Sequence, residues 1–104
     1  MIPVIAGFDW DDGNREKCRK HGVSIADIES MFGRPVAVFP DPAHSRTEER
    51  FKGIGTSKAG RHIFLVFALR QRGGATLVRP ISARYMHSKE MQHYEKEIAK
   101  AQKR

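Results

Sequence analysis

The sequence contains a single cysteine, Cys18, among its 104 residues. One cysteine cannot close an intramolecular disulfide, and it cannot supply the paired thiolates of a cysteine-rich zinc site. No apolar run approaches the ~18 residues that cross a bilayer, and no apolar stretch follows a charged start as in a signal peptide. We therefore expect a cytoplasmic protein with no membrane segment, no metal and no cofactor.

Carboxylates are missing from a long part of the chain, residues 50–89. The same stretch holds nine cations, six of them arginine: Arg50, Lys52, Lys58, Arg61, Arg70, Arg72, Arg79, Arg84 and Lys89. These cations exceed the formal net charge of +7 of the whole chain. A second basic cluster near the N-terminus has Glu16 as its one acid and consists of Arg15, Lys17, Arg19 and Lys20.

This charge pattern has several interpretations. A solvated surface is the simplest, because charged side chains normally lie in water. Unbalanced positive charge also attracts phosphate, and one guanidinium can hold two phosphate oxygens. The arginine content and the lack of local carboxylates favour nucleic acid as the ligand, with an acidic protein partner as the alternative.

Hydrophobic residues make up 39% of the chain, which suffices for one core in a single domain over residues 1–104. Asp11 or Asp12 can cap a first helix that Gly22 ends, and Ser24 can cap a second with Asp27 completing a weak capping box. The predicted elements are a strand within residues 1–10, helices over 12–21 and 24–32, strands over 36–39, 50–56, 61–70 and 76–84, and a helix over 89–103. This order predicts an α+β fold, a largely antiparallel sheet with two N-terminal helices and one C-terminal helix packed on it.

Two of the predicted strands have unusual composition. Residues 63–69 are apolar throughout, which is typical of a central strand covered on both faces. Gly53 and Gly55 are expected to loosen the strand over 50–56.

The last predicted strand contains Pro80, which cannot donate a ladder hydrogen bond and therefore indicates an edge or a β-bulge. A regular strand puts Ser82 and Arg84 on one face and Arg79 on the other. A bulge at the proline would instead bring Arg79 onto the face of Ser82.

A series of short motifs spans nearly the whole chain. They are Phe8-Asp9-Trp10-Asp11, Gly13-Asn14, Lys20-His21-Gly22-Val23-Ser24, Pro40-Asp41-Pro42, His44-Ser45, Glu48-Glu49-Arg50-Phe51, Gly60-Arg61, Ile81-Ser82-Ala83-Arg84, Lys89-Glu90 and Tyr94-Glu95. In this order and spacing the chain resembles the BrnT family of toxins from bacterial toxin–antitoxin pairs.

The resemblance implies a fold similar to the RelE and ParE toxins and a ribonuclease activity that shuts down translation. It also implies a partner encoded alongside, a BrnA-like DNA-binding antitoxin that represses the shared operon and forms a hetero-oligomer with the toxin.

Cleaving RNA without a metal requires a base for the 2′-hydroxyl proton, an acid for the leaving 5′-oxygen, and cations for the phosphorane charge. We expect charge stabilisation from Arg50, Arg70, Arg79, Arg84 and Lys20. RNA contacts are predicted for Lys17, Lys20, Arg50, Arg70, Tyr85 and His87. The alternatives for the arginines are structural ion pairs or contacts with the antitoxin.

Proton transfer is assigned to His21, with Glu49 or His87 as alternatives. His21 is predicted to end a helix, so it could equally serve as a C-terminal cap. Glu49 is the last carboxylate before the acid-free stretch, although a structural ion pair with Arg50 explains it as well. Ser82 joins the catalytic group beside Arg84, but it lacks the elbow motif and paired acid of a nucleophile.

Sequence alone thus predicts a metal-independent endoribonuclease toxin. The alternative is a basic module that binds RNA or protein without catalysis.

Overall fold

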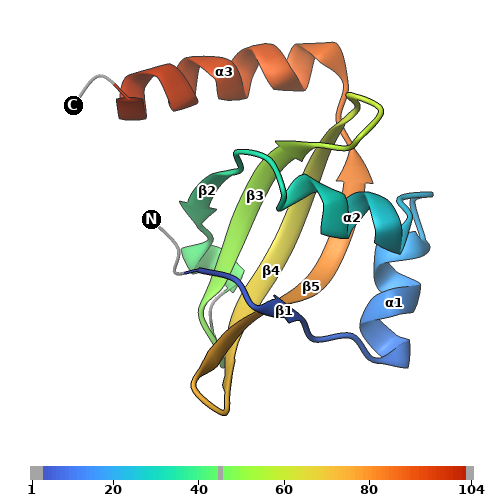
Figure 1. Ribbon diagram of the computed structural model, residues 1–104. Helices are drawn as coiled ribbons and strands as arrows, with labels where there is room; N and C mark the ends of the chain where they lie inside the picture. Colours follow the sequence, from blue (N-terminus) through green and yellow to red (C-terminus); the bar gives the residue numbers. More distant parts are fainter. Residues whose placement is uncertain (1–3, 45, 103–104) are drawn as a thin grey trace.

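The structure is a computed structural model that describes residues 4–44 and 46–102 (Figure 1). Its elements are β1 (Gly7–Phe8), α1 (Asp12–Arg19), α2 (Ile25–Met31), β2 (Ala37–Pro40), a 3₁₀ turn (Pro42–His44), β3 (Arg50–Thr56), β4 (His62–Arg72), β5 (Ala75–Tyr85) and α3 (Ser88–Gln102). None of the helices within these described ranges is long and apolar enough to cross a membrane.

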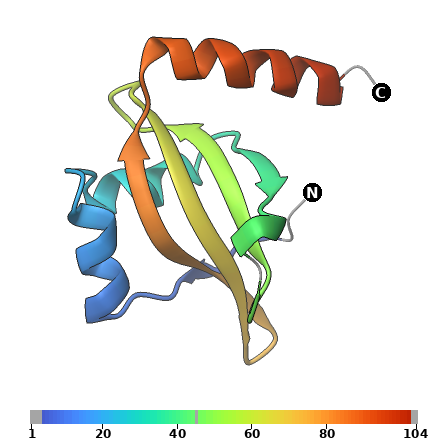
Figure 2. The same cartoon turned by 180° about the vertical axis from the view of Figure 1, so that it is seen from behind.

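The five strands form one sheet in the order β1-β5-β4-β3-β2. β1 pairs in parallel with β5, whereas the other neighbours are antiparallel. In Figure 1, α2 lies in front of the sheet and α1 lies beside β5, while α3 crosses one end of the sheet in both views (Figure 2). The predicted α+β class with a largely antiparallel sheet is confirmed.

The first strand is shorter than predicted. Of the predicted range 1–10, only Gly7 and Phe8 form β1, and residues 1–3 lie outside the described residues. The strand ends early because Asp11 already caps α1, so the chain must turn away from the sheet at Asp9 and Trp10.

The core lies between the sheet and the helices α1 and α2. Its fully buried members come from β4, β5, both helices and the turn between the helices: Ile63, Leu65, Phe67, Val78, Cys18, Val23, Ile28 and Met31. Phe32 packs edge-on against Phe8 and Phe67, with ring centroids 5.7 and 5.6 Å apart respectively. This packing uses every second residue of β4 from Ile63, as a period of two requires.

The prediction that β4 is covered on both faces holds only in part. On the side away from α2, Phe64 and Val66 are only half-buried. Tyr94 of α3 packs on Phe64 with the ring centroids 6.0 Å apart. The helix therefore covers part of this surface, which we call the open face, and leaves its other part to the polar side chains of β3, β4 and β5.

Both helix starts follow the predicted capping residues. At α1, Asp11 and Asn14 exchange hydrogen bonds between side chain and backbone, which makes a reciprocal capping box. At α2, the backbone N–H of Asp27 donates to Ser24 Oγ. The Asp27 carboxylate does not close a second box; it accepts a hydrogen bond from the Tyr85 hydroxyl at 2.7 Å.

Gly53 and Gly55 are sites of close packing on the core side of β3, and the expectation that they loosen the strand is wrong. A Cβ at Gly53 would lie 3.0 Å from Cε1 of Phe67, and one at Gly55 would lie 3.1 Å from Cε of Met31. The missing side chains let the ring and the thioether approach the backbone.

We predict that Gly53→Ala lowers the free energy of unfolding by about 1–3 kcal/mol, because the ring of Phe67 is fully buried and cannot move aside. Gly55→Ala should cost less, because Cε is the flexible end of Met31. Urea unfolding followed by circular dichroism measures both values. Equal stability of Gly53→Ala and the wild type would contradict this packing account.

Cys18 should be chemically inert in the folded protein. Burial raises the pKa of its thiol to about 11, so only about one thiol in a thousand is ionised at pH 8. We expect no labelling by a thiol reagent in native buffer and complete labelling in urea, as read by mass spectrometry. Rapid labelling of the native protein would show that α1 leaves the core open.

Candidate active site

A β-bulge in β5 determines which side chains reach the open face. Val66 pairs with Ser82, and the next residue of β4, Phe67, pairs with Pro80. Ile81 is therefore the extra residue in the β5 strand. The predicted bulge at Pro80 is confirmed, and it places Arg79 on the same face as Ser82.

Asn14 of α1 holds this bulge in place. Its Nδ2 donates hydrogen bonds to the carbonyl oxygens of Pro80 at 2.8 Å and Asp9 at 2.9 Å. The side chain is almost completely buried. Because its Oδ1 accepts from the backbone of Asp11, one amide joins the start of α1 to the irregular part of β5.

The bulge completes a row of side chains across three strands. Arg50 of β3 pairs with Ala68 of β4, and Ala68 pairs with Arg79 of β5. Because strands lie about 4.8 Å apart, the two arginine backbones are about 10 Å apart with a small side chain between them. Arg70 follows two residues further along β4 on the same face. The cations predicted from separate strands thus meet on one surface.

These arginines line a cleft of about 390 Å³. Its lining consists of Asp11, Gly13, Asn14, Lys17, Glu48, Arg50, Arg70, Arg79 and Ile81. Four cations face two carboxylates, which gives the lining a net charge of +2. A cleft of this kind attracts an anion and holds it between charged groups from both sides.

The inference that these arginines have no acidic partners is wrong. Arg79 contacts Asp11 at 2.7 Å and Asp9 at 3.6 Å, and Arg70 contacts Glu48 through two hydrogen bonds of 3.1 and 3.3 Å. No carboxylates lie near these arginines in the sequence, but Asp9 and Asp11 between β1 and α1, and Glu48 before β3, lie near them in the fold. The pairs fix the direction of each guanidinium.

Ion pairing also stabilises the charged forms of Asp11 and Arg79. The backbone N–H of Asn14 and the guanidinium of Arg79 lower the pKa of Asp11, and this carboxylate in turn raises the pKa of Arg79. Asp11 is consequently a weak base, and Arg79 holds its proton more firmly than a free arginine does.

Arg84 lies on the open face outside the cleft lining. Its guanidinium lies 4.7 Å from the centre of the Phe64 ring and contacts the Glu90 carboxylate of α3 at 2.7 Å. This pair raises the pKa of Arg84 and lowers that of Glu90. Ser82 lies between Arg84 and Arg79 on the same face, opposite Val66.

The structure does not bring the predicted proton-transfer residues into the cleft. His21 is exposed beyond the C-terminal end of α1, whereas Asp11 contacts Arg79 at the other end of this helix, about 12 Å away. Glu49 is exposed and is not among the lining residues. His87 is exposed before α3, where its backbone N–H donates to Glu90.

Of the predicted RNA contacts, Lys17 lines the cleft and Lys20 is the exposed C-cap of α1. Tyr85 lies on the other face of the sheet, because it pairs with the core residue Ile63. Its hydroxyl donates to Asp27, and the Arg61 guanidinium covers its ring at 3.5 Å. This tyrosine is separated from the arginine row by the sheet.

Sequence reasoning missed Glu48, Asp11 and Asn14 as members of the cleft. A signal for Glu48 was present, because it precedes Arg50 by two residues and a period of two points both to one face. Asp11 was identified only as a helix cap. Nothing in the pattern connected it or Asn14 to a strand 66 residues further along the chain.

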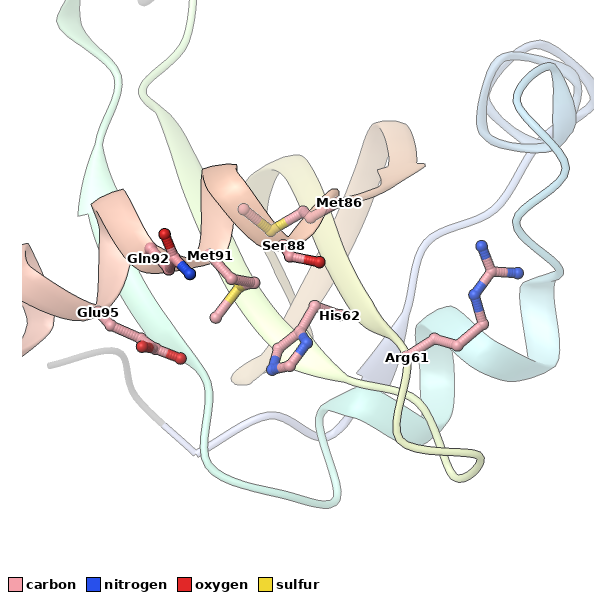
Figure 3. A pocket seen from close by; sticks show the side chains of 7 residues that line it. All are labelled: Arg61, His62, Met86, Ser88, Met91, Gln92 and Glu95. Atoms are coloured by element: carbon pink, nitrogen blue, oxygen red, sulfur yellow. The ribbon is translucent and has the colours of Figure 1, made fainter.

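A second pocket of about 420 Å³ opens where α3 begins. Figure 3 shows the Met91 side chain of α3 pointing toward His62, with Met86 beside the start of the helix, while the Arg61 side chain points away from them. It has no second lysine or arginine in its lining, so it is poorly suited to a polyanion. In the described ranges, no three His, Cys, Asp or Glu side chains are grouped as metal ligands.

Comparison with known proteins connects this geometry to a family. The family model described as the ribonuclease toxin BrnT of a type II toxin–antitoxin system matches residues 10–90, which include every residue that lines the arginine cleft. A search of curated proteins finds no match. The matched region covers most of the chain, and the protein therefore belongs to the BrnT family of ribonuclease toxins from type II toxin–antitoxin systems.

Proposed function

We propose that the protein is an endoribonuclease that cleaves RNA without a metal ion and so inhibits translation in the cytoplasm. The observation that carries this proposal is the row of Arg50, Ala68 and Arg79 on the open face, with Arg70 beside it. The family is one of ribonuclease toxins, and this row is where the chain concentrates oriented positive charge.

The reaction is attack of a 2′-oxygen on the adjacent phosphorus, with loss of the 5′-oxygen. Negative charge grows on the phosphoryl oxygens in the transition state, and oriented guanidiniums stabilise it more than the ground state. Ala68, between Arg50 and Arg79, is fully buried, so a phosphate above it would meet the two guanidiniums and not the alanine side chain.

Neighbouring groups extend this surface along the RNA. Arg84 and Ser82 lie further along β5, and Lys20 lies at the C-terminal end of α1, so we assign these three to the flanking nucleotides. Lys17 lines the cleft itself, so we assign it to the RNA at the cleaved bond. His87 lies near Arg84 through their shared contact with Glu90, at the outer end of this path. Tyr85 is left out of the RNA contact because it lies behind the sheet.

A type II toxin family also implies an antitoxin partner. We propose a BrnA-like DNA-binding antitoxin that forms a hetero-oligomer with this chain and covers the open face. An acidic or apolar segment would complement both the arginine cleft and the half-buried Phe64 and Val66 beside it. The same contact would neutralise the charge and exclude RNA.

We predict that the purified protein degrades single-stranded RNA in EDTA and leaves 2′,3′-cyclic phosphate and 5′-hydroxyl ends, because guanidiniums supply the charge that a metal would. Gel electrophoresis and end-group analysis by mass spectrometry test both points. A 2′-deoxy substitution at the cleaved nucleotide should block the reaction. Activity only with added Mg²⁺ would contradict metal independence, and RNA binding without any cleavage would favour the non-catalytic module.

We predict that Arg79→Lys reduces the single-turnover cleavage rate by at least about 100-fold, because lysine keeps the charge but loses the paired donors. Arg61→Lys is the matched control on the other face, where the guanidinium covers Tyr85, and it should keep the wild-type rate. Thermal unfolding verifies that both variants are folded. Equal rates for the two variants would show that the arginine row is not the reactive site.

A further inference from the structure

Two carboxylates line the arginine cleft, and each of their oxygens accepts one hydrogen bond. They differ in the groups that donate these bonds. Asp11 accepts the Asn14 backbone N–H at Oδ1 and the Arg79 guanidinium at Oδ2. It is thereby committed to capping α1 and to holding Arg79. These contacts lower the pKa of Asp11, and moving its carboxylate toward a substrate would break both the cap of α1 and the contact with Arg79.

Glu48 is held differently. Its two oxygens each accept one hydrogen bond from Arg70, at 3.1 Å from Nε and 3.3 Å from Nη2. A carboxylate offers about four lone-pair positions, so two of them can still meet a substrate. The Glu48 side chain is 32% exposed, which leaves it accessible to an incoming hydroxyl, although Asp11 is more exposed at 52%. The two carboxylates are therefore distinguished by their donors and not by their exposure.

The position of Glu48 relative to the arginine row is also suitable. Glu48 precedes Arg50 by two residues, and its partner Arg70 lies two residues from Ala68 on β4. After Asp11 and Asp9, the Glu48 carboxylate also contributes to raising the pKa of Arg79. A phosphate held above Ala68 would therefore have Glu48 at one side, where the 2′-hydroxyl of the preceding nucleotide can lie.

We propose that Glu48 is the general base of the cleavage reaction, an inference that rests on the proposed ribonuclease function. The 2′-hydroxyl proton passes to a Glu48 carboxylate oxygen as the 2′-oxygen bonds to phosphorus. The bond from phosphorus to the 5′-oxygen breaks, and this oxygen leaves with the electron pair. It takes a proton from the Lys17 ammonium, which also lines the cleft. A water molecule then returns the proton from Glu48 to Lys17, and both groups are restored.

Glu48→Gln tests this role because it keeps the shape of the side chain and removes its basicity. The single-turnover rate should fall about 100- to 1,000-fold. The RNA dissociation constant should stay equal or decrease, because a negative charge leaves a surface that binds phosphate. Glu16→Gln, an exposed glutamate on α1 outside the cleft lining, is the matched control and should keep the wild-type rate.

A pH profile of the cleavage rate distinguishes a Glu48 that accepts the proton from a Glu48 that only positions Arg70. The groups facing Glu48 are Arg70, Arg79, Arg50, Lys17 and Asp11. The wild-type rate should decrease in acid, and the residual rate of Glu48→Gln should lack this decrease. If the glutamine variant is unfolded, Glu48→Asp replaces it and should lose about 10-fold in rate by withdrawing the carboxylate one methylene.

The outcomes are distinct. A wild-type protein that cleaves no RNA overturns the proposed function itself. A wild-type protein that cleaves, together with a Glu48→Gln variant within threefold of its rate, overturns the assignment of Glu48 alone. Loss of activity in Glu49→Gln with retention in Glu48→Gln also overturns it and moves the base to the neighbouring residue.

Discussion

The hydrogen bonds of Asn14 to the β5 bulge are the constraint on which the rest of the open face depends. Without an extra residue in β5, Arg79 would project toward the helices α1 and α2, where an unpaired guanidinium in an apolar core is very costly. The bulge turns it outward, and the buried amide of Asn14 satisfies the carbonyl of Pro80 that the irregular strand exposes. A buried hydrogen bond contributes about 1 kcal/mol, but an unsatisfied buried carbonyl costs about 1–3 kcal/mol. The Asn14 amide therefore matters mainly because losing it would leave the Pro80 carbonyl of the bulge without its partner.

The ion pairs around the cleft follow from this arrangement. They join partly exposed side chains, and such pairs contribute little to stability. Their main effect is orientation, because each guanidinium is held by a carboxylate from another element and is already directed before a ligand arrives. In the proposed mechanism this pre-organisation is what a phosphate transition state requires. The same carboxylates lower the net charge of the cleft, which weakens the attraction for phosphate at long range.

Local patterns in the sequence predicted much of this structure. Capping residues located the starts of α1 and α2, and the predicted strands placed Arg50, Arg70 and Arg79 on three different strands. Pro80 indicated an edge or a bulge, and the bulge is what the structure has. The pairing of Arg79 with Asp9 and Asp11 was not predictable, because it depends on how the start of α1 docks against a strand distant in the sequence. Tyr85 was predicted to contact RNA, but it follows Arg84 directly in β5, and consecutive strand residues point to opposite faces. Glu48 could have been predicted to lie on the face of Arg50, because it precedes this arginine by two residues and strand side chains alternate with a period of two.

The most direct measurement of the central claim is a crystal structure of the protein with a short single-stranded RNA whose reactive 2′-hydroxyl is replaced by a 2′-O-methyl group. The account predicts a phosphate above Ala68, with its oxygens within hydrogen-bond distance of Arg50 and Arg79 and the 2′-oxygen beside Glu48. RNA bound instead behind the sheet near Tyr85, or in the pocket beneath α3, would contradict it.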